Sequence, residues 1–278
     1  MTTAIPGIPL PADISGQLLL RHYQNSQQNI SARAALAIQR LWLRMINPVQ
    51  FSDGWRTLGP LVNGIIANHY SATAANAAEY YVNSRVISGF NHILVPGQDP
   101  DADYIRTVVD AMGPGKFFSF LPEHGEDGAS AMAADALRGA STRMVMMGGR
   151  DTVAHAVLID PIAEGWERVI EPGACGFCAM LAGRGAVYKE DTVKFRAHDH
   201  CHCIARAVFR GQESVNGDIS DEWGKATAGH RGKAAIREWN KYWESKNGGS
   251  EGKTEIAGAR AGTPAVEDKS VGRAAISS

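Results

Sequence analysis

The strings CGFC (residues 175–178) and HDHCHC (residues 198–203) hold all four cysteines of this 278-residue chain. Thiolates and imidazoles are the ligands that Zn²⁺ prefers, and a C-x2-C spacing lets two sulfurs bind one ion. A metal bound by both strings would tie a loop to a distant segment. We therefore expect this stretch to decide the fold of the part of the chain around it.

The candidate ligands form two alternative sets. Four thiolates, from Cys175, Cys178, Cys201 and Cys203, would close a structural zinc site with no open position. In the other set His198 replaces Cys201 or Cys203, which leaves three sulfurs and one imidazole. We expect a structural Zn²⁺ ion, whose binding free energy would contribute directly to folding. The alternative without metal is a group of thiols beside a His-rich loop.

The composition is typical of a globular protein with its own core. The formal net charge is −1, with 44% hydrophobic and 21% charged residues. This charge balance does not favour nucleic acid or a membrane surface as a partner, and no apolar run approaches the about 18 residues of a membrane span. The N-terminal sequence MTTAIPGIPLPADISGQ lacks the pattern of a secretory signal. We therefore expect metal rather than disulfides at the cysteines.

The N-terminal part is patterned for long helices. An apolar stripe with helical spacing predicts a helix over 15–47, which Pro48 would end. A second helix is expected over 57–88, with Gly89 as its C-terminal stop and an Ala-rich middle that suits close helix contact. Two long helices joined by a short turn predict an α-hairpin, to which we assign residues 15–98.

Residues 99–210 are expected to hold further helices and then a small α+β module around the cysteines and histidines. The expected elements are helices over 101–112, 129–147 and 151–160, a loop over 117–128, strands near 166–171, 185–188 and 204–209, and one helical turn over 178–183. Arg143 and Arg150 flank a Met-rich run and are expected to be solvated. The predicted fold class is thus α+β and mostly helical, an N-terminal helical hairpin or bundle followed by the small module with its Cys/His cluster.

The two ends of the chain are expected to contribute little to the core. Residues 1–14 are rich in proline and should be extended, and residues 247–278 are rich in Gly, Ser and Ala and should be disordered. Between the module and the tail, residues 211–246 are polar and contain a helix over 233–245. Its apolar side carries three aromatic residues, Trp239, Tyr242 and Trp243. This side implies docking, either on the chain's own core or on a partner.

The cluster also suggests catalytic alternatives. The string His198-Asp199-His200 after a CxxC is similar to the metal-binding part of HNH nucleases, where one histidine activates water and another binds a divalent metal. Those folds continue with a second CxxC, whereas Cys201-His-Cys203 follows here at once. A zinc deaminase would need P-C-x-x-C, but Ala174 precedes the CxxC. A protease stays an alternative, because a nucleophile and its base can lie far apart in sequence.

The combined motif resembles a known family. The string EPGACGFCAMLAG at 171–183, followed by HDHCHC at 198–203 and IARAVF at 204–209, is similar to the C-terminal module of the Mu F-like minor capsid proteins. These are head-morphogenesis proteins of tailed phages. Near the N-terminus, RHYQNSQQ and LWLRM resemble versions from phages of actinobacteria. The specific resemblance covers about residues 165–210, and the rest matches in its helical character.

The resemblance implies a low-copy virion protein, and the sequence itself shows no constellation of catalytic residues. Such a protein would associate with the portal protein, and with the major capsid or scaffold protein, during procapsid assembly. DNA is a further candidate partner, and no membrane contact is expected. The protein would act in the host cytoplasm during assembly and then lie in the interior of the virion head. Two alternatives are a capsid maturation protease, a label that some relatives carry, and an HNH-like metal-dependent nuclease.

Overall fold

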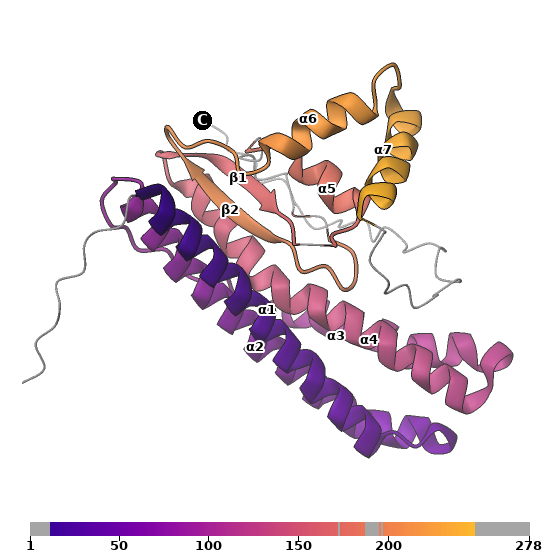
Figure 1. The fold of residues 1–278 in the computed structure, drawn as a ribbon. Coiled ribbons are helices and arrows are strands. Elements are labelled where there is room, and N and C mark those ends of the chain that lie inside the picture. Colours follow the sequence, from indigo (N-terminus) through magenta and orange to yellow (C-terminus); the bar gives the residue numbers. More distant parts are fainter. Residues whose placement is uncertain (1–11, 172, 187–194, 196, 248–278) are drawn as a thin grey trace, which may run out of the picture.

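The structure, a computed structural model, describes residues 12–171, 173–186, 195 and 197–247. This part of the chain is mostly helical with a small antiparallel sheet, which confirms the predicted fold class (Figure 1). In chain order the elements are α1 (Ala12–Met45), the 3₁₀ turn η1 (Pro48–Gln50), α2 (Phe51–Ile87), α3 (Ala102–Asp110), the π-helical turn η2 (Ala111–Gly115), α4 (Lys116–Ile159), β1 (Ala163–Val169), α5 (Gly176–Ala182), β2 (Ile204–Phe209), α6 (Gly217–Ala226) and α7 (Gly232–Asn247).

The long helices α1, α2 and α4 pack along one another as a bundle (Figure 1). Small residues allow a close approach, because Ala74 and Ala77 of α2 are buried. A Cβ at Gly148 of α4 would collide with the backbone of α2. The Thr73 hydroxyl donates across this contact to the Val145 carbonyl at 2.6 Å. The Ala-rich middle of α2 therefore has the role that its composition predicted.

Helix α1 is shifted toward the N-terminus relative to its prediction. It begins at Ala12, so the last residues of the stretch that was expected to be extended are helical, and it ends at Met45. Pro48 does not end this helix directly. It opens η1, whose start is capped because the Asn47 side chain accepts a hydrogen bond from the next turn. The other residues of the expected extended segment, 1–11, lie outside the described part of the chain.

Helix α2 begins six residues earlier than predicted, at Phe51 instead of residue 57. The reason is tertiary: the Phe51 ring stacks on Phe117 with ring centroids 3.9 Å apart, which holds the first turn in helical form. Pro60 therefore lies inside the helix. At the other end, Gly89 has a φ of 86°, the left-handed conformation expected of a helix stop.

Helix α4 replaces what was predicted as a loop and two helices. The expected loop over 117–128 is helical on both sides of Gly125, where the backbone leaves helical geometry with a φ of 65°. Pro114 does not end the preceding helix, because η2 carries the chain on into α4. Gly148 and Gly149 do not end a helix either. Both are buried against α2 and α1, so packing holds the backbone helical where an exposed glycine pair would favour a stop.

The small sheet packs on the C-terminal part of α4 (Figure 1). Strands β1 and β2 are antiparallel, with Val169 opposite Ile204. β2 occupies the predicted residues, whereas β1 begins at Ala163 instead of residue 166. A third strand over 185–188 was also expected. Its first two residues are not in a strand, and the other two lie outside the described part of the chain.

The C-terminal helices cover the module on the side away from the bundle (Figure 1). Trp239 and Trp243 of α7 are buried and donate their indole N–H groups to the carbonyls of Gly176 and Ala174, each at 2.7 Å. The aromatic side of α7 therefore docks on this chain's own module, which decides the question that the sequence left open. Helix α6 was not predicted, because its sequence is polar. Its Trp223 packs against Trp239 with centroids 5.3 Å apart. The tail from residue 248 lies outside the described part of the chain.

Candidate metal centre

Two local structures position the candidate ligands. Cys175 is the N-cap of α5, and its sulfur accepts a hydrogen bond from the Cys178 backbone N–H at 3.5 Å. This places Cys178 in the first turn of the helix, with its side chain on the same side. The second string forms a turn directly before β2, in which His200 has a left-handed backbone with a φ of 62°. The turn brings His198, Cys201 and Cys203 to the start of α5.

All five predicted ligands lie together. The sulfurs of Cys175 and Cys178 and the Nε2 atom of His198 are within 4.8 Å of one another, and so are the sulfurs of Cys178, Cys201 and Cys203. Cys178 belongs to both groups. Its sulfur lies 3.8 Å from that of Cys201 and 3.5 Å from His198 Nε2, and His198 Nε2 lies 3.1 Å from the Cys175 sulfur. All four cysteines are free thiols, so the structure contains no disulfide in place of a metal site.

Two of these distances match the ligand separations of tetrahedral zinc. With Zn–S bonds of about 2.3 Å and Zn–N bonds of about 2.0 Å, a tetrahedron separates two sulfurs by about 3.8 Å and a sulfur from a nitrogen by about 3.5 Å. The Cys178–Cys201 and Cys178–His198 separations, 3.8 Å and 3.5 Å, agree with this. Cys178 thus stands at ligand spacing from both Cys201 and His198, and it links the two groups of three donors. Both sets considered from the sequence contain Cys178.

The cluster has a buried side and an exposed side. Cys178, Cys201 and Cys203 are buried, whereas Cys175 and His198 face solvent. Metal could therefore enter from solvent and be held against a dry interior. In a structural zinc site, protein ligands take every position.

The cluster shifts the pKa of its members in opposite directions. The pKa of Cys175 is lowered to about 4, because it accepts hydrogen bonds from the Cys178 thiol and from His198. The pKa of His198 is raised to about 9 by its contact with Cys175. Contact with the Cys178 and Cys203 thiols also lowers the pKa of Cys201, and the nearby Arg150 guanidinium acts in the same direction. Contacts with Cys175 and Cys201 raise the pKa of Cys178. The site thus favours thiolate at some of its sulfurs, the form that binds metal.

The ligand turn is attached to helix α4. The backbone N–H of His200 donates to the Gly139 carbonyl at 3.2 Å, and a Cβ at Gly139 would come within 2.5 Å of the His200 ring. One turn further along, Arg143 donates to Asp199 at 2.8 Å and to the Tyr104 hydroxyl at 2.8 Å. His200 thus lies against the bundle and outside both ligand groups.

Sequence reasoning missed two arginines behind the sulfurs. Arg150, expected to be solvated, is only 1% exposed and donates to the carbonyls of Cys201 and Cys203 at 2.7 Å and 2.9 Å. Arg168 is 2% exposed and reaches the sulfurs of Cys178 and Cys201. A signal existed for Arg168, because strand alternation places it on the same face as the apolar Trp166. None existed for Arg150, since only the tertiary packing brings α4 to the cluster.

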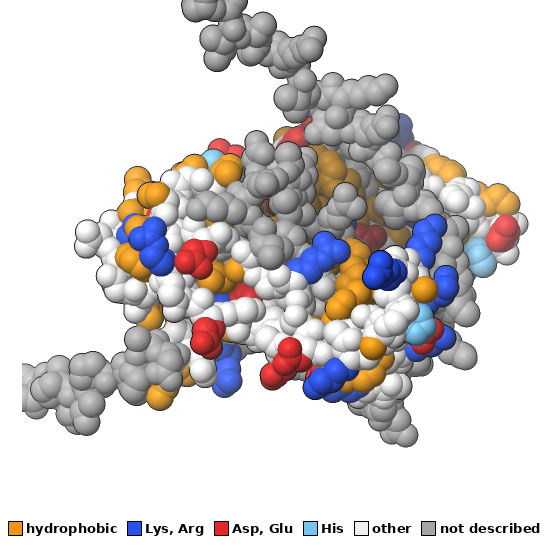
Figure 2. Space-filling view, turned by 90° about the horizontal axis from the view of Figure 1, so that it is seen from above, with side chains coloured by type: hydrophobic (Ala, Val, Ile, Leu, Met, Phe, Trp, Pro, Cys, Tyr) orange, Lys and Arg blue, Asp and Glu red, His pale blue; other side chains and the backbone are white. Residues whose placement is uncertain are grey.

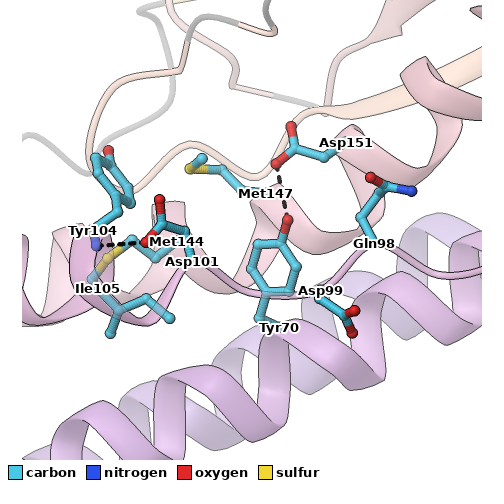
Figure 3. Close-up of a pocket in the computed structure, with 9 residues that line it drawn as sticks. All are labelled: Tyr70, Gln98, Asp99, Asp101, Tyr104, Ile105, Met144, Met147 and Asp151. Atoms are coloured by element: carbon cyan, nitrogen blue, oxygen red, sulfur yellow. Dashed lines mark hydrogen bonds between the residues drawn. The ribbon is translucent and has the colours of Figure 1, made fainter. Parts of the chain in front are cut away.

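A separate acidic pocket of about 300 Å³ lies between α2, α3 and α4 (Figure 3). Asp99, Asp101 and Asp151 line it. The Tyr70 hydroxyl donates to Asp151 at 3.0 Å, and Asp101 caps α3 by accepting from the Tyr104 N–H at 2.9 Å. Burial and the Asp151 carboxylate raise the pKa of Tyr70. Two of the three carboxylates are thus already engaged in local hydrogen bonds, and no sequence motif marked this pocket.

Among the described helices, none combines the length and apolar character that a membrane crossing requires.

Comparison with known proteins places the chain in a family. Comparisons with curated proteins and with solved structures yield no match. A family model described as VG15 protein matches residues 17–227, which span the bundle, both Cys/His strings and α6. The chain therefore belongs to the VG15 protein family, a phage-associated protein family.

Proposed function

We propose that this phage protein is a structural component of head assembly, a minor capsid protein that associates with the portal and contains a structural zinc clamp. The observation that carries the proposal is the convergence of Cys175 and Cys178 with His198, Cys201 and Cys203 at the junction between module and bundle. A Zn²⁺ ion held there would cross-link α5 to the turn before β2. Thiolate-rich sets of this kind are typical of structural rather than catalytic zinc.

The small size of the module supports a need for such a clamp. In the described part of the chain its sheet has two strands, and two-stranded sheets are marginal without further support. Part of that support comes from α4, which packs on both strands, and from α7, which packs on α5. The cysteine strings lie between these two supports, so a metal there would stabilise the weakest part of the fold.

The proposed partners are the portal protein and the major capsid or scaffold protein, with DNA as a weaker candidate. The family match and the motif resemblance support a role among phage proteins. On the face seen in Figure 2, the described Lys and Arg side chains are interspersed with acidic and hydrophobic ones. A mixed surface of this kind favours protein contacts over the phosphate backbone of DNA. The expected locations are the host cytoplasm during assembly and the interior of the head.

Metal analysis of the purified full chain tests the zinc clamp. We expect close to one zinc per chain by elemental analysis. Cys178→Ser should lose the metal under either ligand set, because Cys178 belongs to both groups. Phe177→Ala is the matched control, since Phe177 lies in the same turn with a half-exposed side chain and should leave the zinc content unchanged. A wild-type chain purified without zinc that also fails to bind added zinc would refute the clamp.

Co-purification tests the role in assembly. The chain is co-expressed with the portal protein of its own phage, and with the major capsid protein alone as a control. We expect it to co-elute with the portal in size-exclusion chromatography and to be incorporated into procapsids at low copy number. Absence from procapsids together with no portal binding would overturn the assembly role and leave the zinc clamp to be judged by its own experiment.

A capsid maturation protease is the second candidate, because Cys175 and His198 form an exposed thiol–imidazole pair at 3.1 Å. This is the arrangement of a nucleophile and its base. The protease predicts cleavage of the major capsid protein that is abolished by Cys175→Ser. The HNH-like nuclease predicts instead DNA cutting with Mg²⁺ or Mn²⁺ that is abolished by His200→Ala. The structural role predicts neither activity.

A further inference from the structure

Two arginine side chains are buried directly behind the sulfurs. From α4, Arg150 places Nη2 at 3.5 Å from the Cys201 sulfur while it holds the carbonyls of Cys201 and Cys203. From β1, Arg168 places Nη1 at 3.6 Å from the Cys178 sulfur and 3.9 Å from the Cys201 sulfur. Both guanidiniums lie over the ring of Phe195, at 4.6 Å and 3.8 Å from its centroid. The two arginines thus approach the cluster from two different elements.

Buried guanidinium groups require compensation by negative charge, because moving a charge out of water costs several kcal/mol unless it is paired. Within the described part of the chain, Arg150 forms no ion pair with a carboxylate, and its Nη1 atom has no hydrogen-bond partner. Glu171 acts on Arg150 only through its longer-range field and lies 3.7 Å from His202. The Cys201 sulfur is therefore the group in direct contact with Arg150 that can carry a compensating charge.

A metal-bound cluster would supply this charge. A Zn²⁺ ion with four thiolates carries two net negative charges, and one with three thiolates and a neutral imidazole carries one. Either centre would lie against two buried cations. Because metal coordination holds every ligating sulfur as a thiolate, the metal-bound centre places its negative charge at the sulfurs that the guanidiniums contact. The arginines therefore match the metal-bound form better than the metal-free form.

We propose that Arg150 and Arg168 are positioning residues of the metal centre: they donate N–H···S hydrogen bonds to Cys201 and Cys178 and balance the charge of the metal-bound thiolates, and Arg150 also fastens the ligand turn to α4. This inference rests on the proposed zinc clamp. Arg150 also holds the backbone of the turn through the carbonyls of Cys201 and Cys203. Metal binding is therefore coupled to docking of the module on the bundle.

Cobalt titration tests the inference on the full chain. Co²⁺ replaces Zn²⁺ in thiolate sites and shows a sulfur-to-cobalt charge-transfer band that reports electron density on sulfur. Arg150→Met and Arg168→Met should each weaken metal binding about 10- to 100-fold, the usual effect of removing a group that hydrogen-bonds a metal ligand. The band should also move to lower energy, because the sulfurs lose N–H donors. Arg150→Lys and Arg168→Lys keep the charge and should lie between wild type and the methionine variants.

Arg85→Met is the matched control. Arg85 is also a buried arginine of the bundle, but it pairs with Asp160 at 2.8 Å and makes no hydrogen bond to a sulfur in the described part of the chain. It should lower stability and leave both the cobalt band and the affinity unchanged. If Arg150 and Arg168 variants behave like Arg85→Met, the inference is overturned while the zinc clamp stands. If wild type shows no charge-transfer band, the clamp itself fails.

Alkylation gives an independent readout. N–H···S hydrogen bonds reduce the nucleophilicity of zinc-bound thiolates, so iodoacetamide should modify the zinc-loaded Arg168→Met chain several-fold faster than wild type. Equal rates for the two would contradict the proposed hydrogen bonds. If Arg168→Met fails to fold, Arg168→Lys takes its place in the alkylation measurement. A lysine retains the charge but cannot contact two sulfurs and a ring at once, so its alkylation should also be faster than that of wild type.

Discussion

At the residue scale, the candidate ligands depend on contacts that a single added methyl group would disturb. Gly139 of α4 lies under the His200 ring, with no room for a Cβ. His200 itself has a left-handed backbone, so the turn that carries His198 and Cys201 has little freedom to move away. The position of the ligand turn is thus set from outside the turn, by the surface of α4.

Gly139→Ala should therefore weaken zinc binding and lower the melting temperature, although alanine favours a helix more than glycine does. Gly64→Ala is the matched control, because Gly64 lies in a helix and a Cβ there has nothing within 4 Å. The control should stabilise the protein by up to about 1 kcal/mol. Thermal unfolding and competitive zinc titration of both variants measure the difference. Equal stabilisation by the two alanines would show that the turn does not rest on Gly139.

A second residue-scale prediction concerns acid stability. Burial tends to raise the pKa of Asp160, but the hydrogen bonds from Arg85, the Ile162 N–H and Tyr81 outweigh this and leave the pKa lowered. A carboxyl whose pKa is lower in the folded state contributes stability above its unfolded pKa of about 3.9, and this contribution is lost as the pH falls through the folded value. Asp160→Asn should cost about 3–5 kcal/mol at neutral pH, since it leaves Arg85 without its anion. The cost should shrink toward low pH, as urea unfolding at several pH values would show. A constant cost from pH 7 to pH 3 would contradict this assignment.

At the element scale, α7 holds the start of α5 in place. The Trp239 indole donates to the Gly176 carbonyl, which lies between the two cysteines of the CxxC motif. The apolar stripe that the sequence showed on this helix thus meets the element that carries Cys178. Docking of α7 therefore helps to set the backbone geometry of the first cysteine string, residues 175–178.

Trp239→Ala should cost about 3–5 kcal/mol, because it removes a fully buried aromatic side chain. Trp239→Phe keeps much of the packing and loses the indole hydrogen bond, so it should cost less. Ile236→Ala, on the more exposed side of the same helix, is the control and should cost under about 1 kcal/mol. Chemical denaturation measures all three. A small effect of Trp239→Ala would mean that α7 does not contribute to the stability of the module.

At the scale of the whole molecule, the hydrophobic core has distinct parts. One cluster lies within the bundle and includes Leu58, Ile66 and Leu137, and it contains no residue of the sheet. Another joins the bundle to the sheet and includes Cys178, Cys201 and Cys203 among its buried residues. A metal bound at the cysteines would therefore stabilise the second cluster far more than the first.

Chelation should accordingly loosen one part of the molecule before the other. When zinc is removed, we expect amide hydrogen exchange to accelerate in β1, α5 and β2, while the middle of α2 stays protected. Hydrogen-exchange mass spectrometry with and without a chelator measures this, with the Cys178→Ser variant as a reference for permanent loss of metal. A uniform rise in exchange over the whole chain would show that bundle and module unfold together.

The sequence by itself determined the candidate ligands, their spacing, the long amphipathic helices and strand β2, because these follow from local chemistry and from periodicity along the chain. Only the tertiary structure decided that α4 continues through Gly148 and Gly149, that Trp239 docks on this chain's own module, and that Arg150 lies behind Cys201. The physical reason is that each of these features depends on a partner distant in sequence. Glycine ends an exposed helix but not one packed against two others, and an arginine is solvated unless a distant segment brings it hydrogen-bond acceptors.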